Sequence, residues 1–312
     1  MPSPRDVLTP DSLAMLQVIA DTGSFAAAAR QLGLVPSALT YRVRQMEETL
    51  DVLLFDRSAR QAQPTEAGQA LLLEGARLLQ DMDAVAHRVR RVATGWEAEL
   101  TVVADEVISR TTLLDLVEAF YALGAPTKLK LGMGTLSGPL ETLSSGRADL
   151  ALGIGTNVSS ISGLQVLDLG DMTFLFAVSP FHPLAHNEEP ITDAMLLEHR
   201  LVVLADSAQR ERTSIGLLGG QDTFTVESIQ AKIDAQVRGI GCGFLPESAL
   251  RPYVHTGQLI VKAVSRPTRK IRMRYAWKSP SNGGELGRAL QWWLTQLESA
   301  VTRQALLESP SI

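Results

Sequence analysis

The spacing of apolar residues in the first fifty positions predicts three short helices, over 10–23, 25–32 and 36–50. Thr9 and Ser24 precede the first two helices, and their hydroxyl groups are typical caps of helix N-termini. The third helix opens with a proline and follows the second after a short glycine-containing connection. Helices joined in this way are typical of the helix-turn-helix that enters the major groove of DNA, although an ordinary three-helix packing unit gives the same spacing.

The third predicted helix has two chemically different faces. Leucine, valine and methionine recur on the side that would face a core. The other side is polar and basic, and it carries Ser37, Thr40, Tyr41, Arg44 and Gln45. This second face is the candidate for reading DNA.

A short hairpin follows, with predicted strands over 53–55 and 61–63. Its tip, 56–60, holds Arg57 and Arg60. As a wing, the hairpin could place these guanidinium groups against phosphates or in the minor groove. A solvated hairpin with unpaired charges is the alternative for either arginine alone.

One long helix is predicted from Thr65, its cap, to about Thr94. Apolar residues and one glycine recur along it in alternating steps of four and three, at Leu71, Gly75, Leu78, Met82, Val85, Val89 and Val92. Such a stripe pairs helices, and the element would be roughly 45 Å long at the usual rise per residue. We therefore expect a dimerisation helix, the alternative being a single helix buried in its own chain.

From residue 99 the pattern changes to alternating strands and helices. Strands over 100–104, 128–132 and 149–154 alternate with helices over 112–121 and 140–145, which predicts a βαβαβ unit. A second unit has strands over 201–204, 224–226 and 243–245 and a helix over 228–238. The fold class is therefore α/β, and two such lobes imply a cleft.

Ligands of open α/β sheets bind beyond the carboxyl ends of the strands. The candidate ligand-binding residues at those ends are Asp105, Glu106, Gly134, Thr135, Gly155, Thr156, Asp206, Ser207, Glu227 and Ser228, and Ser109 and Phe244 are expected to join them at the ligand. Asp105 and Glu106 suggest a ligand that bears hydroxyl, amide or amine donors. Alternatively, Glu106 begins the next helix, where a carboxylate favours the helix dipole.

The C-terminal region adds one strand and one helix to the prediction. Residues 270–277 alternate apolar and charged positions, as in a half-buried strand, and its cations are interpreted as a solvated face rather than a nucleic-acid patch. A last helix is expected over 285–307.

Composition limits the function classes. The 312 residues suffice for two or three domains, and the apolar runs are too short for a transmembrane helix, so a cytoplasmic protein is expected. The net charge is −5, and residues 1–95 hold ten arginines, eleven acids and no lysine. Any DNA contact must therefore be local and made by guanidinium groups. The single cysteine, Cys242, excludes an internal disulfide.

Signatures of catalysis are missing from the sequence. The glycines over 239–243 follow a helix and precede a strand, the reverse of a dinucleotide-binding loop. His182 and His186 are separated by a proline and lack a third ligand nearby, so no metal or cofactor is predicted. Two alternatives remain: an exported solute-binding protein, and a dehydratase-like enzyme with Asp105 or Glu106 as general base.

A series of specific motifs stands in fixed order between residues 9 and 68. They are Gly23-Ser24-Phe25, Ala28-Ala29, Pro36-Ser37-Ala38-Leu39-Thr40, Glu47, Leu54-Phe55-Asp56-Arg57 and Pro64-Thr65-Glu66-Ala67-Gly68. In these motifs the chain resembles the LysR-type transcriptional regulators. Weaker similarity continues to the C-terminus, for example at Asp149-Leu150-Ala151-Leu152.

The resemblance implies a winged helix-turn-helix over 1–65, a linker helix that dimerises over 66–95, and an effector domain shaped like a periplasmic binding protein. Lobe 1 of that domain would comprise 96–168 and 266–307, and lobe 2 would comprise 169–265. The implied partners are double-stranded promoter DNA, a small-molecule effector and further copies of the chain in a homodimer or homotetramer. RNA polymerase is a further candidate partner.

Carried over position by position, the family's DNA contacts fall on Ser24, Ala26, Pro36, Ser37, Thr40, Tyr41, Arg44, Arg57, Arg60 and Thr65. Many members have Gln-Pro where this chain has Pro36-Ser37, and arginine where it has Tyr41, so the bases that are read are not predicted. The expected function is effector-controlled, sequence-specific binding to promoters, without catalysis.

Overall fold

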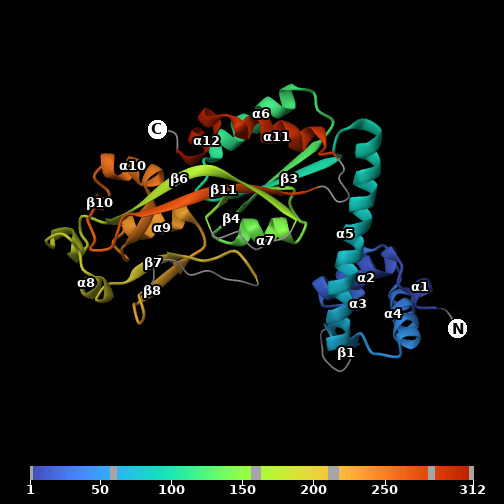
Figure 1. Ribbon diagram of the computed structural model, residues 1–312. Helices are drawn as coiled ribbons and strands as arrows, with labels where there is room; N and C mark the ends of the chain where they lie inside the picture. The colour runs from blue at the N-terminus through green and yellow to red at the C-terminus, as the bar shows by residue number, and fades with distance from the viewer. Residues whose placement is uncertain (1–2, 57–61, 156–162, 210–217, 280–284, 309–312) are drawn as a thin grey trace. The chain divides into compact units, whose positions relative to one another are not determined.

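The computed structural model describes residues 3–56, 62–155, 163–209, 218–279 and 285–308 (Figure 1). The chain divides into two compact units, Met1–Arg90 and Arg91–Ile312, which are treated separately below. In the described residues no helix is both long and apolar enough to cross a bilayer, and no three His, Cys, Asp or Glu side chains are grouped to bind a metal ion.

The N-terminal unit, the head, confirms the three predicted helices. Its elements are α1 Pro4–Val7, α2 Pro10–Thr22, α3 Phe25–Gln31, α4 Pro36–Leu50, β1 Phe55–Asp56, β2 Gln63–Pro64 and the start of α5 Glu66–Thr94. Thr9 and Ser24 act as the caps that the sequence predicts, accepting the backbone N–H groups of Ser12 and Ala27. Buried leucine, isoleucine, valine and methionine side chains of α2 and α4 form the core.

Glu47 is a buried carboxylate, 6% exposed, at the inner side of α4. Its Oε1 accepts hydrogen bonds from the backbone N–H of Leu54 at 2.9 Å and of Phe55 at 3.4 Å. The Phe55 ring in turn meets Phe25 edge to face, with centroids 5.6 Å apart. One acidic side chain thereby joins α4 to the base of the hairpin.

The hairpin strands lie one to two residues later than predicted. Leu54 donates its N–H to Glu47 and accepts a hydrogen bond from Thr65 N at 3.0 Å, so its backbone is not available to pair with β2. The ladder therefore begins at Phe55, which pairs with Pro64. The hairpin tip with Arg57 and Arg60 lies outside the described residues.

The second unit is built on a seven-stranded mixed sheet in the order β10-β6-β11-β5-β3-β4, with β9 also pairing β6. Its strands are β3 Glu99–Asp105, β4 Lys128–Gly134, β5 Leu150–Ile154, β6 Leu164–Val178, β9 Gly243–Pro246, β10 Ile260–Val261 and β11 Arg269–Lys278. A separate pair, β7 Leu201–Leu204 and β8 Thr223–Val226, is parallel. The α/β character and the strands of both predicted lobes are confirmed.

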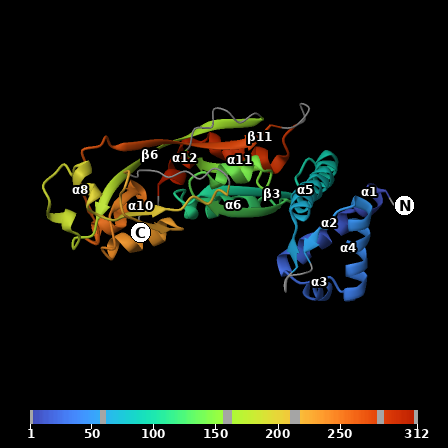
Figure 2. The same cartoon turned by 90° about the horizontal axis from the view of Figure 1, so that it is seen from below.

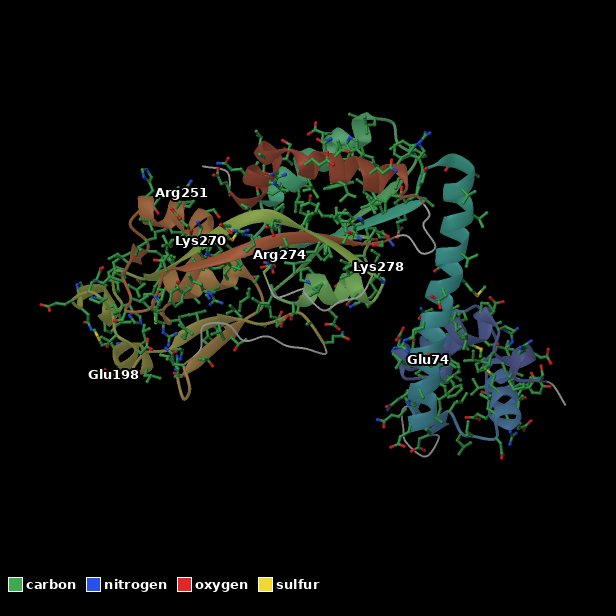
Figure 3. The ribbon with its side chains drawn as sticks, viewed as in Figure 1. Glu74, Glu198, Arg251, Lys270, Arg274 and Lys278 are labelled. Atoms are coloured by element: carbon green, nitrogen blue, oxygen red, sulfur yellow. The ribbon has the colours of Figure 1, made fainter. Side chains whose placement is uncertain are left out.

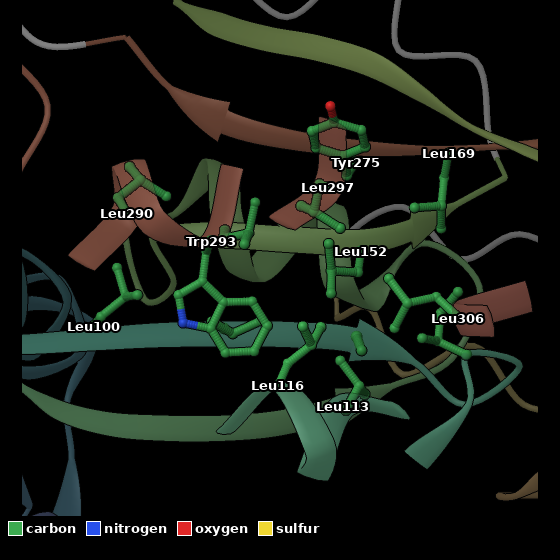
Figure 4. Packing of buried hydrophobic residues seen from close by; sticks show 14 of the residues in the cluster. Leu100, Leu113, Leu116, Leu152, Leu169, Tyr275, Leu290, Trp293, Leu297 and Leu306 are labelled. Carbon is green, nitrogen blue, oxygen red and sulfur yellow. The ribbon is translucent and has the colours of Figure 1, made fainter. Parts of the chain in front are cut away.

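Helices cover both faces of the sheet. They are α6 Arg110–Ala122, α7 Gly138–Ser144, α8 Asp193–Leu197, α9 Ile229–Val237, α10 Glu247–His255, α11 Arg288–Glu298 and α12 Ala300–Leu307, with a 3-10 turn at Pro183–His186. The main core packs α6, α11 and α12 on one face around the fully buried Trp293 and Phe120 (Figure 4). A second cluster places Leu143 of α7 against the other face.

Two long antiparallel strands, β6 and β11, run side by side through the whole unit (Figures 1 and 2). β6 passes the predicted lobe boundary at 168–169 without interruption and then pairs β9 and β10 through its second half. Lys270, Arg272 and Arg274 of β11 pair with Asp168 and Asp171 of β6, including Arg272 Nη1 to Asp168 Oδ2 at 2.9 Å; Figure 3 labels Lys270 and Arg274 on the strand. This salt-bridged face accounts for the alternating charges of the strand.

The predicted last helix over 285–307 is wrong as a single element, because the chain breaks it at Ser299. That residue has extended backbone, with φ −68° and ψ 122°, and its hydroxyl caps α12 by accepting Thr302 N–H. The break turns α12 so that Leu306 is buried in the main core and its carbonyl accepts the N–H of Ser109 at 2.8 Å.

Candidate functional site

The polar face of α4 is exposed, as a DNA-reading surface requires. Pro36, Ser37 and Arg44 are exposed, and Tyr41 keeps 66% of its surface accessible. Thr40 is half-buried, and its hydroxyl donates to the Pro36 carbonyl at 2.9 Å. Among the described residues Arg44 makes a solvent-exposed pair with Glu48 at 3.7 Å, which is weak enough for a phosphate or a base to replace it.

The other predicted DNA contacts lie around α4. Ala26 is exposed on α3, and Ser24 is the cap of that helix. Thr65 begins α5: its hydroxyl accepts Gly68 N–H at 3.0 Å and donates to the Leu53 carbonyl at 2.6 Å. Ser24 and Thr65 therefore position the helices on either side of α4 whether or not they also touch a phosphate.

The second unit contains a cavity between its two α/β halves. The cavity and the solvent-filled space at its opening together span about 830 Å³. The walls are mainly apolar, and three charged side chains interrupt them. The lining residues are Asp105, Val107, Leu136, Gly153, Gly155, Phe174, Leu201, Val203, Leu204, Ile229, Lys232, Phe244, Arg269, Ile271 and Met273.

Asp105 closes the end of β3 and is 4% exposed. Its two carboxylate oxygens accept the backbone N–H groups of Val107 at 3.0 Å and Leu136 at 2.8 Å. Burial raises the pKa of Asp105 to about 7, against the opposing effect of these hydrogen bonds. Both oxygens of Asp105 are therefore bonded to backbone groups of the same half of the unit. The carboxyl group is only partly ionised at neutral pH.

A polar clasp joins the two halves on either side of Leu136, a residue of the cavity wall. Thr135 and Ser207 exchange hydrogen bonds in both directions, including Thr135 N to Ser207 Oγ at 2.9 Å and Ser207 N to Thr135 Oγ1 at 3.0 Å. Ser137 donates to the Asp206 carboxylate, and Gln209 N donates to Glu141 at 2.6 Å. A Cβ at Gly138 would collide with the Ser207 hydroxyl, so the clasp needs glycine there.

Glu106 forms a further bridge between the halves. Its Oε2 accepts the N–H of Ile229 at 2.7 Å, at the N-terminus of α9, where Ser228 is the cap. The carboxylate thus stabilises the exposed N–H groups of a helix in the opposite half. Asp105 and Glu106 both already accept backbone N–H groups, and a donor-bearing ligand at these two residues stays a prediction.

The twelve residues expected to bind a ligand fall into different places. Asp105, Gly155 and Phe244 line the cavity. Gly134, Thr135, Asp206 and Ser207 lie at the clasp, and Glu106 and Ser228 lie at the start of α9. Ser109 caps α6 instead of lining the cavity, Glu227 is exposed, and Thr156 lies outside the described residues.

The sequence analysis missed the two cations of the cavity, Lys232 and Arg269. Burial, followed by the neighbouring charge of Arg269, lowers the pKa of Lys232 to about 8. Burial also lowers the pKa of Arg269. One signal was available: Lys232 occupies the early part of α9, where a cation is unfavourable for the helix dipole.

We expect Lys232→Met to raise the free energy of unfolding of the second unit by about 1–3 kcal/mol at neutral pH. The pKa of Lys232 is about 8 in the folded protein against an ordinary value of 10.5, so the charge opposes folding fully below pH 8. This penalty shrinks as the pH rises from 8 and vanishes above 10.5.

Urea unfolding of both proteins between pH 7 and pH 11 measures this difference. Lys270→Met is the matched control, since Lys270 is exposed on β11 outside the cavity. A Lys232→Met effect that does not change with pH would contradict the prediction.

Comparisons with known proteins agree with both units. The LysR substrate binding domain matches residues 93–301, and the helix-turn-helix family described as bacterial regulatory protein, lysR family, matches residues 10–69. The HTH-type transcriptional regulator YeeY of Escherichia coli is 35% identical over 288 residues, covering 92% of each chain. The probable regulator YhaJ of Escherichia coli is 32% identical over 291 residues, covering 93% of this chain and 96% of its own.

Solved structures share the fold. Full-length CbnR, crystallised with its target DNA, has a TM-score of 0.63 at 18% identity and covers 94% of this chain and 99% of its own. The Vibrio cholerae virulence activator AphB has a TM-score of 0.54 at 16% identity and covers 93% of this chain and 98% of its own. With both family domains in order and relatives above 30% identity along almost the whole length, the chain belongs to the LysR family of bacterial transcriptional regulators.

Proposed function

We propose that this regulator reads promoter DNA through the polar face of α4 and is controlled in the cytoplasm by a small molecule bound in the cavity of the second unit. The observation that carries the proposal is the exposed face of α4, with Ser37, Thr40, Tyr41 and Arg44, in a family helix-turn-helix. Arg44 would contact guanine or phosphate, and Tyr41 would contact base methyl groups or the backbone. We ascribe no chemical reaction to the protein.

The cavity supplies the control. Its two halves are joined by the clasp and by the β6–β11 strand pair, so a ligand that fits the closed cavity would favour the closed arrangement. The ligand must prefer one arrangement of the halves, since a ligand with equal affinity for both arrangements would not change their populations.

A second copy of the chain is the proposed partner of α5. Five apolar side chains along the predicted stripe are exposed: Leu78, Met82, Val85, Val89 and Val92. The stripe is continuous with Gly75, which contacts Leu13 inside the head. Pairing of two such helices would bring two heads to one operator. Assembly into a tetramer and contact with RNA polymerase stay predictions from the family resemblance.

The proposed function predicts that Thr40→Ala and Arg44→Ala weaken binding to the protein's own upstream DNA by about 10- to 100-fold. Titration of full-length protein against that DNA and a scrambled duplex, at several salt concentrations, measures the effect. Arg44→Ala should also reduce the salt dependence by about one released counterion, if it contacts a phosphate.

Two matched controls lie on the same helix. Thr49→Ala removes the same local bond as Thr40→Ala, from a hydroxyl that donates to Gln45 O at 2.7 Å. Glu48→Ala frees Arg44 from its exposed pair and should leave binding unchanged or tighter. Equal affinity of the unaltered protein for both duplexes would contradict the proposed function and favour a ligand-binding protein without specific DNA recognition.

A further inference from the structure

Two cations line the cavity without an acidic partner. Lys232 comes from α9 and Arg269 from the start of β11. Burial in the cavity wall lowers the pKa of both side chains. Among the described residues no carboxylate lies within salt-bridge distance of either one. Like charges in a partly buried wall repel each other, and they are normally retained where an anion is bound.

The acidic residues nearby do not neutralise this pair. Asp105 has both oxygens engaged by backbone N–H groups, and its charge couples to Glu106 and Asp206, not to Lys232. Burial also raises the pKa of the Cys242 thiol to about 12, so this neighbour of Lys232 is uncharged at neutral pH. The positive charge of the wall is therefore left for a ligand.

A polar group without a partner lies next to Lys232. Gln236, one turn further along α9, is fully buried, and neither atom of its amide has a hydrogen-bond partner among the described residues. Both side chains border Gly243: a Cβ there would lie 3.0 Å from Gln236 Nε2 and 3.5 Å from Lys232 Cε. Because residue 243 is a glycine, no side chain fills the space beside the Gln236 amide and the Lys232 side chain.

The rest of the wall is apolar. Phe174, Phe244, Ile271 and Met273 border the cavity, together with leucine and valine side chains of β7. Such walls bind a compact hydrocarbon body and give no partner to a chain of hydroxyl groups. The two regions together define a ligand with one charged end and one apolar end.

We propose that the effector is a small monocarboxylate with a compact apolar body, whose carboxylate lies between Lys232 and Arg269. This inference rests on the proposed function, since it names the chemical class that controls the same cavity. Arg269 would hold the carboxylate through its planar N–H pairs and Lys232 through a single charge-assisted bond. An amine of the same shape would meet two positive charges and is excluded by them.

The test is the thermal unfolding of the full-length protein with three acids, each paired with its own carboxamide. The acids are 3-phenylpropanoate, cyclohexanecarboxylate and 4-methylpentanoate, at constant ionic strength and pH 7. We expect at least one acid to raise the unfolding midpoint in a saturable way, with at least tenfold higher apparent affinity than its amide.

The variants Lys232→Met and Arg269→Met should each lower that affinity at least tenfold, whereas Lys270→Met, next to Arg269 on β11, should not. Neither cavity variant should fail to fold, because each removes a partly buried charge that has no partner. The affinity of the acid should also fall as the pH rises through 8, where Lys232 loses its proton.

Three results would overturn the proposal: amides that bind as well as acids, no stabilisation by any of the three acids, or stabilisation that survives both cavity variants. Any of these three results would leave the proposed reading of promoter DNA intact, provided that the unaltered protein still binds its operator. Loss of specific DNA binding in the unaltered protein would instead remove the proposed function, whatever the ligand result.

Discussion

Glu47→Ala should destabilise the head strongly, lowering its opening free energy by about 2–4 kcal/mol. The change leaves the buried N–H groups of Leu54 and Phe55 without their carboxylate acceptor. It also removes a charged side chain that is 6% exposed and leaves a cavity beneath the hairpin. Because the hairpin base and α4 would no longer be held together, operator binding should fall with stability.

Hydrogen exchange of the full-length protein, resolved to peptides, measures this opening separately from the second unit. Amides of residues 54–55 should exchange about 30- to 900-fold faster in the variant. Glu48→Ala is the matched control, since its neighbouring carboxylate is 71% exposed and pairs only with Arg44. Protection that stays equal in Glu47→Ala and the unaltered head would show that the carboxylate does not hold the hairpin.

Val85→Asp should separate the proposed dimer into single chains, raising its dissociation constant at least 100-fold. Val85 is 56% exposed in the middle of the apolar stripe of α5, so in a paired helix the variant buries one carboxylate on each side of the seam. Removing two buried valines and adding two desolvated charges costs several kcal/mol for each dimer.

Sedimentation velocity over a concentration series gives the dissociation constant directly. Asp83→Lys serves as control, because it makes a larger charge change on an exposed position of α5 away from the stripe. Operator affinity should fall together with dimerisation in Val85→Asp, since a single head loses the second half-site. A Val85→Asp protein that sediments as the unaltered one would place the dimer interface elsewhere.

Local signals in the sequence were sufficient for α2, α3 and α4 of the head, whereas the short helix α1 was not predicted. Thr9 and Ser24 cap helices at the predicted positions, and α5 contains the whole of the predicted apolar stripe. The hairpin was displaced because Leu54 bonds to Glu47, a contact that spans seven residues and has no periodic signal. Ser299 was missed for a related reason, since one serine inside an apolar period does not reveal a cap.

The effector cavity was predicted only in outline. The strand-end rule identified Asp105 and Gly155, because their positions follow from the order of strands and helices alone. Lys232 and Arg269 come from a helix and a strand whose approach depends on tertiary packing. The rule also could not show that Asp105 and Glu106 use their oxygens on backbone N–H groups.

The position of β11 within the sheet sets an order for synthesis of the protein. This strand lies between β6 and β5, although it is among the last segments to leave the ribosome. Until it emerges, the fifteen residues of β6 expose the edge that β11 later covers, and an unpaired strand edge favours aggregation. The head needs no residue beyond α5 and can fold long before. A nascent chain released before residue 269 would therefore carry a finished DNA-binding head on an unfinished sensor, and could occupy operators without responding to any signal.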